Sequence, residues 1–222
     1  MRIIALIVPA ALLAAGLPSA GRSQHGAGVD ESEPGSFRPP PVDEVYPAPI
    51  EWRGLRVLHI GDSHVSRGLT EGLRDHLLRA GARYEAVTWV GSRSRSWVQS
   101  GKLRRLLRER SPGAVIVTLG TNAIRHPKPR HLQYWDRALV EQIGPRLCFW
   151  LGPPSLIEDR HGLNPALMES TTPCRYFETR LLDFPPREDG RFHLTRAQGL
   201  SWAAATWVWI NGGPAPRSGD AL

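Results

Sequence analysis

The 222-residue sequence lacks most of the features that would place it at once in a specialised class of protein. It has only two cysteines, Cys148 and Cys174, and its histidines form no metal-ligand pattern, so no metal site is predicted. No internal repeat has the period of a solenoid or a propeller. The longest apolar run, Ile3–Leu17, is shorter than the roughly 20 residues that span a bilayer, and Pro9 interrupts it.

Residues 1–20 are nevertheless typical of a secretory signal peptide, with Arg2 before the apolar run and small residues around Ser19 and Ala20 after it. An uncleaved membrane anchor is the alternative. No cysteine follows the run and no paired arginine precedes it, which disfavours a lipoprotein and the twin-arginine route. We expect an exported protein, periplasmic or secreted, that contacts a membrane only if this segment is retained.

The composition changes after the signal segment. Gly, Ser and Pro dominate residues 21–50, and few of these residues could build a core, so a disordered or polyproline-like linker is predicted. One folded domain is expected over residues 51–212, followed by a flexible tail at 213–222.

The formal charge of +7 comes mostly from arginine, and its densest part is Lys102–Arg110. Leu103, Leu106 and Leu107 repeat there at helical spacing, so the arginines are expected on the outer face of a surface helix. A weak attraction to anionic polymers of a cell envelope is the functional alternative. No nucleic-acid-binding module accompanies the charge, so nucleic acid is not a predicted partner.

Apolar segments alternate with helical patterns along the predicted domain. The segments typical of strands buried on both faces are Leu55–Ile60, Tyr84–Val90, Ala114–Leu119 and Leu147–Leu151. A shorter fifth strand is predicted at Arg175–Phe177, and helices are predicted at 66–80, 97–110, 131–143 and 195–210. This alternation with short connections predicts an α/β fold in which helices cover both faces of a parallel sheet of about five strands.

Four residues suited to acyl chemistry fall on one edge of that sheet. Ligands bind outside the carboxyl ends of parallel strands, and Ser63, Gly91 and Asn122 follow the first, second and third strands. Ser63 lies within Gly-Asp-Ser-His at 61–64, on a strand-to-helix turn that would expose its hydroxyl. His193 precedes the last helix, which can return to the same edge.

These residue types would form a serine hydrolase site. Ser63 would be the nucleophile, His193 its base, and Asp189 the group that orients the imidazole. The Ser63 N–H, the Gly91 N–H and the Asn122 side-chain amide would stabilise the oxyanion. The structural alternatives are helix caps for the serine and histidine, and turn positions for the glycine and asparagine.

On these motifs the chain resembles the SGNH (GDSL-type) hydrolase superfamily, whose four sequence blocks carry Ser, Gly, Asn and His in this order. The resemblance spans residues 55–210. It implies a flavodoxin-like, three-layer α/β/α sandwich, the site roles given above, and activity without a cofactor. Members of the family are esterases, lipases, carbohydrate deacetylases and O-acyltransferases.

Three positions depart from the family pattern. His64 stands where many members have Leu, a form that resembles SGNH domains tied to polysaccharide acylation in the envelope. The third block lacks the acidic residue that usually follows its Asn. Asp189 and His193 are four residues apart rather than three, so Asp183, Glu188 or a backbone carbonyl could hold the imidazole instead.

Further residues near these blocks are candidates for substrate contacts. Arg93, Arg95 and Arg125 lie just beyond the oxyanion positions, where they could recognise a carboxylate or phosphate, and Trp97 could stack on a sugar ring. Exposed arginines and a buried aromatic are the alternatives. His59 lies on a predicted buried strand and is expected to be a core histidine.

We also predict a disulfide between Cys148 and Cys174. Cys148 lies at the start of the fourth strand and Cys174 directly precedes the fifth, so parallel neighbours would bring both to the same end of the sheet. Two small buried thiols are the alternative.

The predicted function is that of an exported serine esterase. It would remove short acyl groups, acetyl foremost, from envelope carbohydrate through an acyl-enzyme, with an acylated carbohydrate or another small ester as its partner. An O-acyltransferase that passes the acyl group to a polysaccharide is one alternative. A non-catalytic carbohydrate-binding protein is the other, and the unusual Asp–His spacing supports it.

Overall fold

A computed structural model describes residues 50–182, 184–185 and 192–214. The predicted signal peptide lies outside the described residues, as do most of the linker and of the tail. Asp183, Glu188 and Asp189, the three candidates for the acid, also lie outside them.

The described chain is built on one parallel sheet with the strand order β2-β1-β3-β4-β5. Its strands are β1 (Arg56–Gly61), β2 (Arg83–Thr88), β3 (Ala114–Thr118), β4 (Leu147–Leu151) and β5 (Arg175–Phe177). All four pairs of neighbouring strands are parallel, which is the order and direction of flavodoxin-like folds. The predicted fold class is confirmed.

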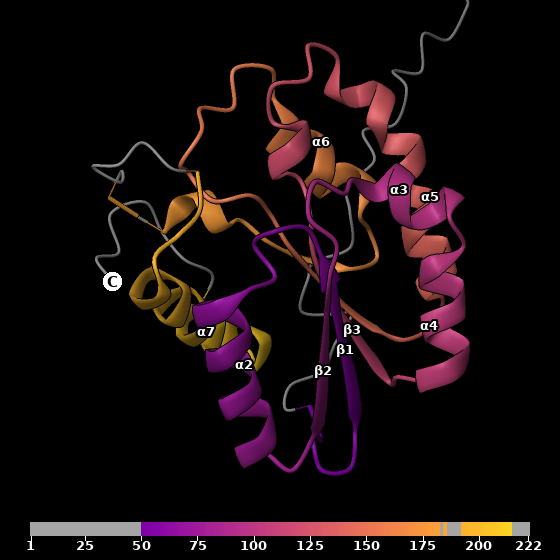
Figure 1. Ribbon diagram of the computed structural model, residues 1–222, viewed down its shortest axis with the longest axis vertical. Helices are drawn as coiled ribbons and strands as arrows, with labels where there is room; N and C mark the ends of the chain where they lie inside the picture. Colours follow the sequence, from indigo (N-terminus) through magenta and orange to yellow (C-terminus); the bar gives the residue numbers. More distant parts are fainter. Residues whose placement is uncertain (1–49, 183, 186–191, 215–222) are drawn as a thin grey trace, which may run out of the picture. The chain divides into compact units, whose positions relative to one another are not determined.

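Helices cover both faces of the sheet (Figure 1). One face carries α2 (Arg67–Arg79) and α7 (Arg196–Ile210). The other carries α3 (Ser94–Gln99), α4 (Lys102–Arg110), α5 (Gln133–Ile143) and α6 (Leu163–Ser170). Three short 3-10 turns complete the described elements: η1 (Thr121–Ala123), η2 (Pro129–Leu132) and η3 (Thr179–Leu181). The result is the predicted three-layer α/β/α sandwich.

The position of the central strands, between two layers of helices, explains why their sequences are almost uninterrupted apolar runs. Successive side chains of a strand point to opposite faces, and both faces of β1 and β3 are covered. Val115 therefore packs under α4 and α5, whereas Ile116 packs under α2 and α7. The prediction that β2 is buried on both faces is wrong, because β2 is an edge strand whose residues are half-buried or exposed.

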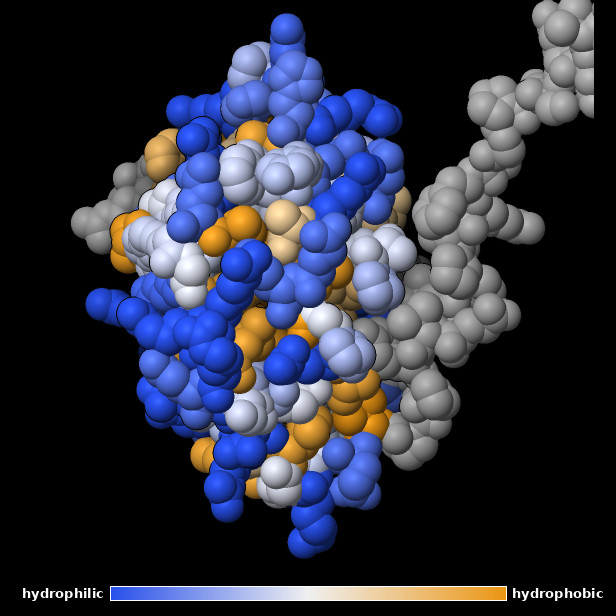
Figure 2. Space-filling view, turned by 90° about the vertical axis from the view of Figure 1, so that its right-hand side faces the viewer, coloured by the Kyte–Doolittle hydropathy of each residue, from blue (hydrophilic) through white to orange (hydrophobic). Residues whose placement is uncertain are grey.

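The arginine-rich segment forms the surface helix that the leucine spacing predicts. Leu103, Leu106 and Leu107 are buried, and hydrophilic side chains cover much of the face of the molecule on this side (Figure 2). The single helix predicted at 97–110 is instead two helices, because the chain turns at Gly101 between α3 and α4.

Helices α2 and α7 pack unusually closely because glycines lie in their interface. A Cβ on Gly68 would lie 2.0 Å from the carbonyl oxygen of Arg196, and one on Gly72 would lie 2.5 Å from the Cβ of Ala203. Gly199 of α7 in turn lies directly against the backbone of α2. Because side chains are absent at these points, the first turns of the two helices lie against each other.

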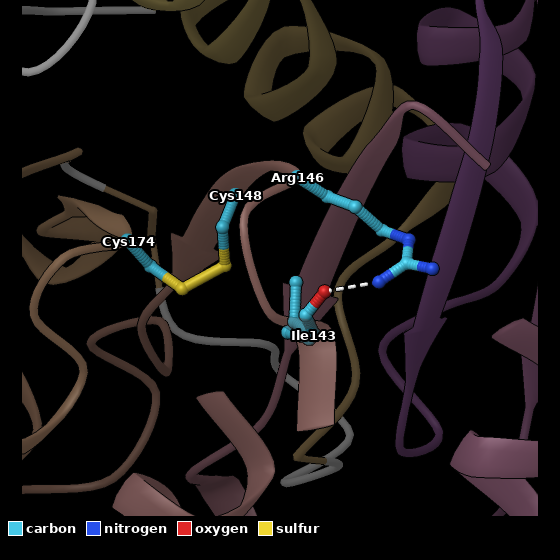
Figure 3. The surroundings of a disulfide bond; sticks show 4 residues. All are labelled: Ile143, Arg146, Cys148 and Cys174. Atoms are coloured by element: carbon cyan, nitrogen blue, oxygen red, sulfur yellow. Dashed lines mark hydrogen bonds between the residues drawn. A yellow bond between two sulfur atoms is a disulfide. The ribbon is translucent and has the colours of Figure 1, made fainter. Parts of the chain in front are cut away.

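A disulfide joins Cys148 of β4 to Cys174, the residue before β5, as predicted (Figure 3). The two Cα atoms are 4.5 Å apart, and the bond closes a sequence separation of 26 residues. Nearby, the Arg146 side chain donates a hydrogen bond to the carbonyl oxygen of Ile143, at the end of α5. Among the described residues, no helix has the length and apolar character needed to cross a membrane.

Candidate active site

Ser63 and His193 meet at the carboxyl edge of the sheet. Ser63 lies in the turn between β1 and α2, and His193 lies three residues before α7. His193 Nε2 is 2.8 Å from Ser63 Oγ, although the two residues are 130 positions apart in the sequence. The serine is half-buried and the histidine is exposed, so the pair is open to solvent. A neutral imidazole at this distance can accept the hydroxyl proton.

Asp62 ties the loop of Ser63 to the loop after β3. Its carboxylate accepts hydrogen bonds from the backbone N–H of His64 at 2.9 Å and from Asn122 Nδ2 at 3.2 Å. Its own N–H donates to the Thr118 carbonyl at 3.1 Å. Burial raises the pKa of Asp62 to about 6, although both hydrogen bonds to the carboxylate oppose this. The acid of the Gly-Asp-Ser-His motif therefore positions its neighbours rather than facing solvent.

The three predicted oxyanion donors lie on adjacent loops. Asn122 Nδ2 also donates to the Ser92 carbonyl at 3.1 Å, which holds the side-chain amide against the loop that contains Gly91. Gly91 has a φ of +74°, in the left-handed region that favours glycine, and a Cβ there would meet open space. The loop after β2 is thus accessible from outside next to the asparagine amide.

Trp97 supports this loop from the core. Of the two readings that the sequence allows, the buried aromatic is confirmed, and stacking on a sugar ring is excluded because the side chain is fully buried. Its indole N–H donates to Ser92 Oγ at 2.9 Å. A buried indole needs such a partner, and here the hydrogen bond fixes the residue that follows Gly91.

Two further histidines lie in the interior. His59 bonds Tyr84 Oη at 2.7 Å and Thr118 Oγ1 at 2.8 Å, and burial lowers its pKa to about 3. It is the core histidine that the sequence predicts. His64 packs under the His193 ring, with 5.4 Å between the ring centroids. Burial, and secondarily the charge of the neighbouring imidazole, lower the pKa of His64 to about 4, so it is neutral near pH 7.

A cavity of about 170 Å³ lies beside the candidate oxyanion site. Gly120 and Ala123, which flank Asn122, line it on one side, and the first residues of α3 line it on another. Trp135, a half-buried residue of α5, contributes an aromatic wall.

The sequence interpretation overlooked Trp135 and the glycines of α2. Gly68 and Gly72 are poor helix formers, and two of them four residues apart in a predicted helix are a signal of close packing. No sequence signal marks Trp135, because the side of α5 that lines the cavity depends on how this helix packs on the sheet. In the part of the chain that the structure describes, no three His, Cys, Asp or Glu side chains are grouped so as to hold a metal ion.

No family model matches this chain, and no curated protein matches its sequence. Solved structures do match its fold. A catalytic mutant of Axe2, an acetylxylan esterase from Geobacillus stearothermophilus, superposes with a TM-score of 0.58 at 15% identity, over 75% of this chain and 98% of that one. TesA matches with a TM-score of 0.55 at 20% identity, over 70% of this chain and 97% of that one.

A GDSL-like protein from Parabacteroides merdae matches with a TM-score of 0.53 at 12% identity, over 72% of this chain and 96% of that one. The likenesses extend over nearly the whole length of the matched chains. The described domain therefore has the fold of the SGNH (GDSL-type) hydrolases.

Proposed function

We propose that this protein is an exported serine esterase that removes short acyl groups, acetyl foremost, from carbohydrate of the cell envelope. The observation that carries the proposal is the 2.8 Å contact between Ser63 Oγ and His193 Nε2, at the sheet edge where Asn122 also lies. A serine hydroxyl needs a base within hydrogen-bond reach to become a nucleophile, and this pair supplies one.

The reaction would pass through an acyl-enzyme. Ser63 Oγ attacks the ester carbonyl carbon while His193 takes its proton, and the carbonyl oxygen becomes an oxyanion. His193 then returns the proton to the leaving sugar oxygen as the C–O bond breaks. Water attacks the acyl-enzyme with the same histidine as base, which releases the carboxylic acid and restores the serine.

The oxyanion would be stabilised by the Ser63 N–H, the Gly91 N–H and the amide of Asn122. Both hydrogen bonds from Asn122 Nδ2 go to protein oxygens, at 3.1 and 3.2 Å. These distances are at the long end of the range for such bonds, and an oxyanion is a stronger acceptor. The amide can therefore turn part of its donor capacity to the reacting oxygen.

Two observations favour hydrolysis and export. His193 is exposed, so water can reach an acyl group on the serine, which favours an esterase over an acyltransferase. The Cys148–Cys174 disulfide is typical of proteins outside the reducing cytosol. The acetylated carbohydrate is proposed from the names of fold relatives, since Axe2 and AlAXEase are both acetylxylan esterases.

A fluorophosphonate probe tests the proposal directly. The folded wild-type protein should be labelled at Ser63, and Ser63→Ala should abolish both the labelling and the hydrolysis of 4-nitrophenyl acetate. The change removes one hydroxyl on a half-buried turn, so the melting temperature should be nearly unchanged. A folded wild-type protein that is neither labelled nor active would instead support the carbohydrate-binding alternative.

The orienting acid is proposed to be Asp189, and a set of three variants tests it. Asp189→Asn should lower kcat far more than Asp183→Asn or Glu188→Gln, because an amide can favour the wrong imidazole tautomer. If a backbone carbonyl orients the ring, all three changes should be mild while His193→Ala remains severe.

A further inference from the structure

Two segments at the edge of the sheet that carries the site have an excess of positive charge. The segments that follow β2 and β3, residues 89–96 and 120–136, contain five Lys and Arg residues and a single acidic residue, Asp136. Asp136 is buried and accepts hydrogen bonds from Ser94 Oγ at 2.5 Å and Ser170 Oγ at 3.4 Å. Its carboxylate is therefore held by protein hydroxyls, and the exposed charges of these two segments are all positive.

Three arginines of these segments have no acidic partner in the part of the chain that the structure describes. Arg93, Arg95 and Arg125 are exposed, and none of them forms an ion pair with any described residue. Arg130, by contrast, pairs with Glu169 at 3.4 Å. Among the described residues, no carboxylate therefore pairs with these three guanidinium groups.

Neighbouring side chains hold two of these arginines in place. Arg95 donates from Nε to Gln99 Oε1 at 2.9 Å, and its guanidinium lies 5.5 Å from the ring centroid of Trp135. The guanidinium of Arg125 lies 5.4 Å from the ring centroid of Phe192, the residue directly before His193. Stacking of this kind leaves the edge of a guanidinium available for hydrogen bonds.

The cavity beside the oxyanion loops opens among these groups. Arg93, Arg95 and His126 line it, Trp135 forms one wall, and Leu163 is among its apolar lining residues. The buried Asp136 also lines it, with its carboxylate held by the hydroxyls of Ser94 and Ser170. At about 170 Å³ it is smaller than the pockets of roughly 300–1,000 Å³ that bind drug-sized ligands. It is suited to one small ring rather than to a long acyl chain.

We propose that this cavity and its arginines bind a sugar residue that carries a carboxylate, so that the substrate is an acidic glycan. This rests on the proposed function, since the bound sugar would be part of the acylated chain presented to Ser63. A guanidinium matches a carboxylate with two parallel N–H donors, and the Trp135 ring, which Arg95 covers on one side, offers its cavity-lining surface to the sugar. Arg93 and Arg95 would determine the preference for acidic over neutral chains.

The test compares two esters of equal length, acetylated tri-galacturonate and acetylated xylotriose. The ratio of their kcat/KM values should favour the acidic substrate by about tenfold or more at low salt. This is the discrimination that one hydrogen bond to a charged group typically provides. The ratio should fall towards one near 1 M NaCl, where the Debye length is only about 3 Å.

Variants assign this preference to the cavity. Arg93→Gln and Arg95→Gln should each lower the ratio several-fold, whereas Arg108→Gln, an equal charge change on the outer face of α4, should leave it unchanged. Trp135→Ala should weaken use of both substrates, because stacking does not depend on the carboxylate. Equal kcat/KM values for the two substrates, or equal losses in Arg93→Gln and Arg108→Gln, would overturn the proposal.

Calorimetry with Ser63→Ala separates this proposal from the proposed catalytic function. Preferential binding of unacetylated tri-galacturonate over xylotriose, lost in the Ser63→Ala/Arg93→Gln double variant, would support the subsite even if no ester were hydrolysed. Hydrolysis without this preference would refute the subsite and leave the esterase intact. Tighter binding of a phosphorylated oligosaccharide of the same length would overturn the assignment to a carboxylate.

Discussion

The packing of α2 against α7 makes a sharp prediction about Gly68. In Gly68→Ala the new Cβ would lie 2.0 Å from the Arg196 carbonyl oxygen, whereas real Cβ contacts are essentially never below 3.0 Å. The obstacle is backbone, so the helices must separate by about 1 Å at this point. Ser63 precedes α2 and His193 precedes α7, and the separation would lengthen their 2.8 Å contact beyond hydrogen-bond range.

The expected effect on catalysis is larger than that on stability. A misplacement of about 1 Å between reacting groups lowers the rate by about 10²-fold. Overpacking destabilises by about 1–3 kcal/mol, but alanine is a better helix former than glycine by about 1 kcal/mol, so the net loss of stability should be at most about 2 kcal/mol.

Three measurements check this prediction: kcat for 4-nitrophenyl acetate, the rate of fluorophosphonate labelling, and the melting temperature. Asp75→Ala, an exposed alanine substitution on the same helix, is the matched control and should behave as wild type. A Gly68→Ala protein with wild-type kcat and an equal or higher melting temperature would show that the close packing does not position the pair.

Three further outcomes are expected. Asn122→Ala should lower kcat by about 10²–10³-fold with little change in KM, as for loss of one oxyanion donor, and a defect confined to KM would instead place this residue in substrate binding. Reduction of the Cys148–Cys174 disulfide, which closes 26 residues, should lower the free energy of unfolding by about 3 kcal/mol in chemical denaturation, and unchanged denaturation would contradict this. Burial lowers the pKa of His59 in the folded protein to about 3. As the pH falls below about 6.5, this histidine is therefore protonated in the unfolded chain before it is protonated in the folded protein. Between about pH 6 and pH 4, the unfolding free energy of wild type should fall by about 1.4 kcal/mol per pH unit relative to that of His59→Gln. An equal dependence of the two unfolding free energies on pH would refute this.

The sequence alone predicted the α/β class, all five strands and the edge on which the candidate residues meet. Central parallel strands are covered on both faces, so they are continuous apolar runs such as Ala114–Thr118, which can be recognised locally. The carboxyl ends of parallel strands share one edge, so Ser63 and Asn122 could be placed together without knowledge of the strand order. The amino ends of parallel neighbours also share an edge, and this predicted the pairing of Cys148 with Cys174.

The exposure of individual elements was decided by tertiary contacts. Strand β2 lies at the edge of the sheet and is only half-buried, a position that its own sequence does not specify. Trp97 and Trp135 are both aromatic residues of helical segments close to the site. Trp97 fills the core under the loop that contains Gly91, whereas Trp135 lines the cavity, and only the packing of α3 and α5 distinguishes them.

The site likewise depends on contacts between distant segments. Asp62 is a motif residue in the sequence, but its function as a link follows from Asn122, 60 positions away, which donates to its carboxylate. Ser63 and His193 precede the two helices, α2 and α7, whose glycines let them approach each other closely. Local propensities determine which elements form, whereas the distances between side chains follow from how those elements pack, and only the tertiary structure contains them.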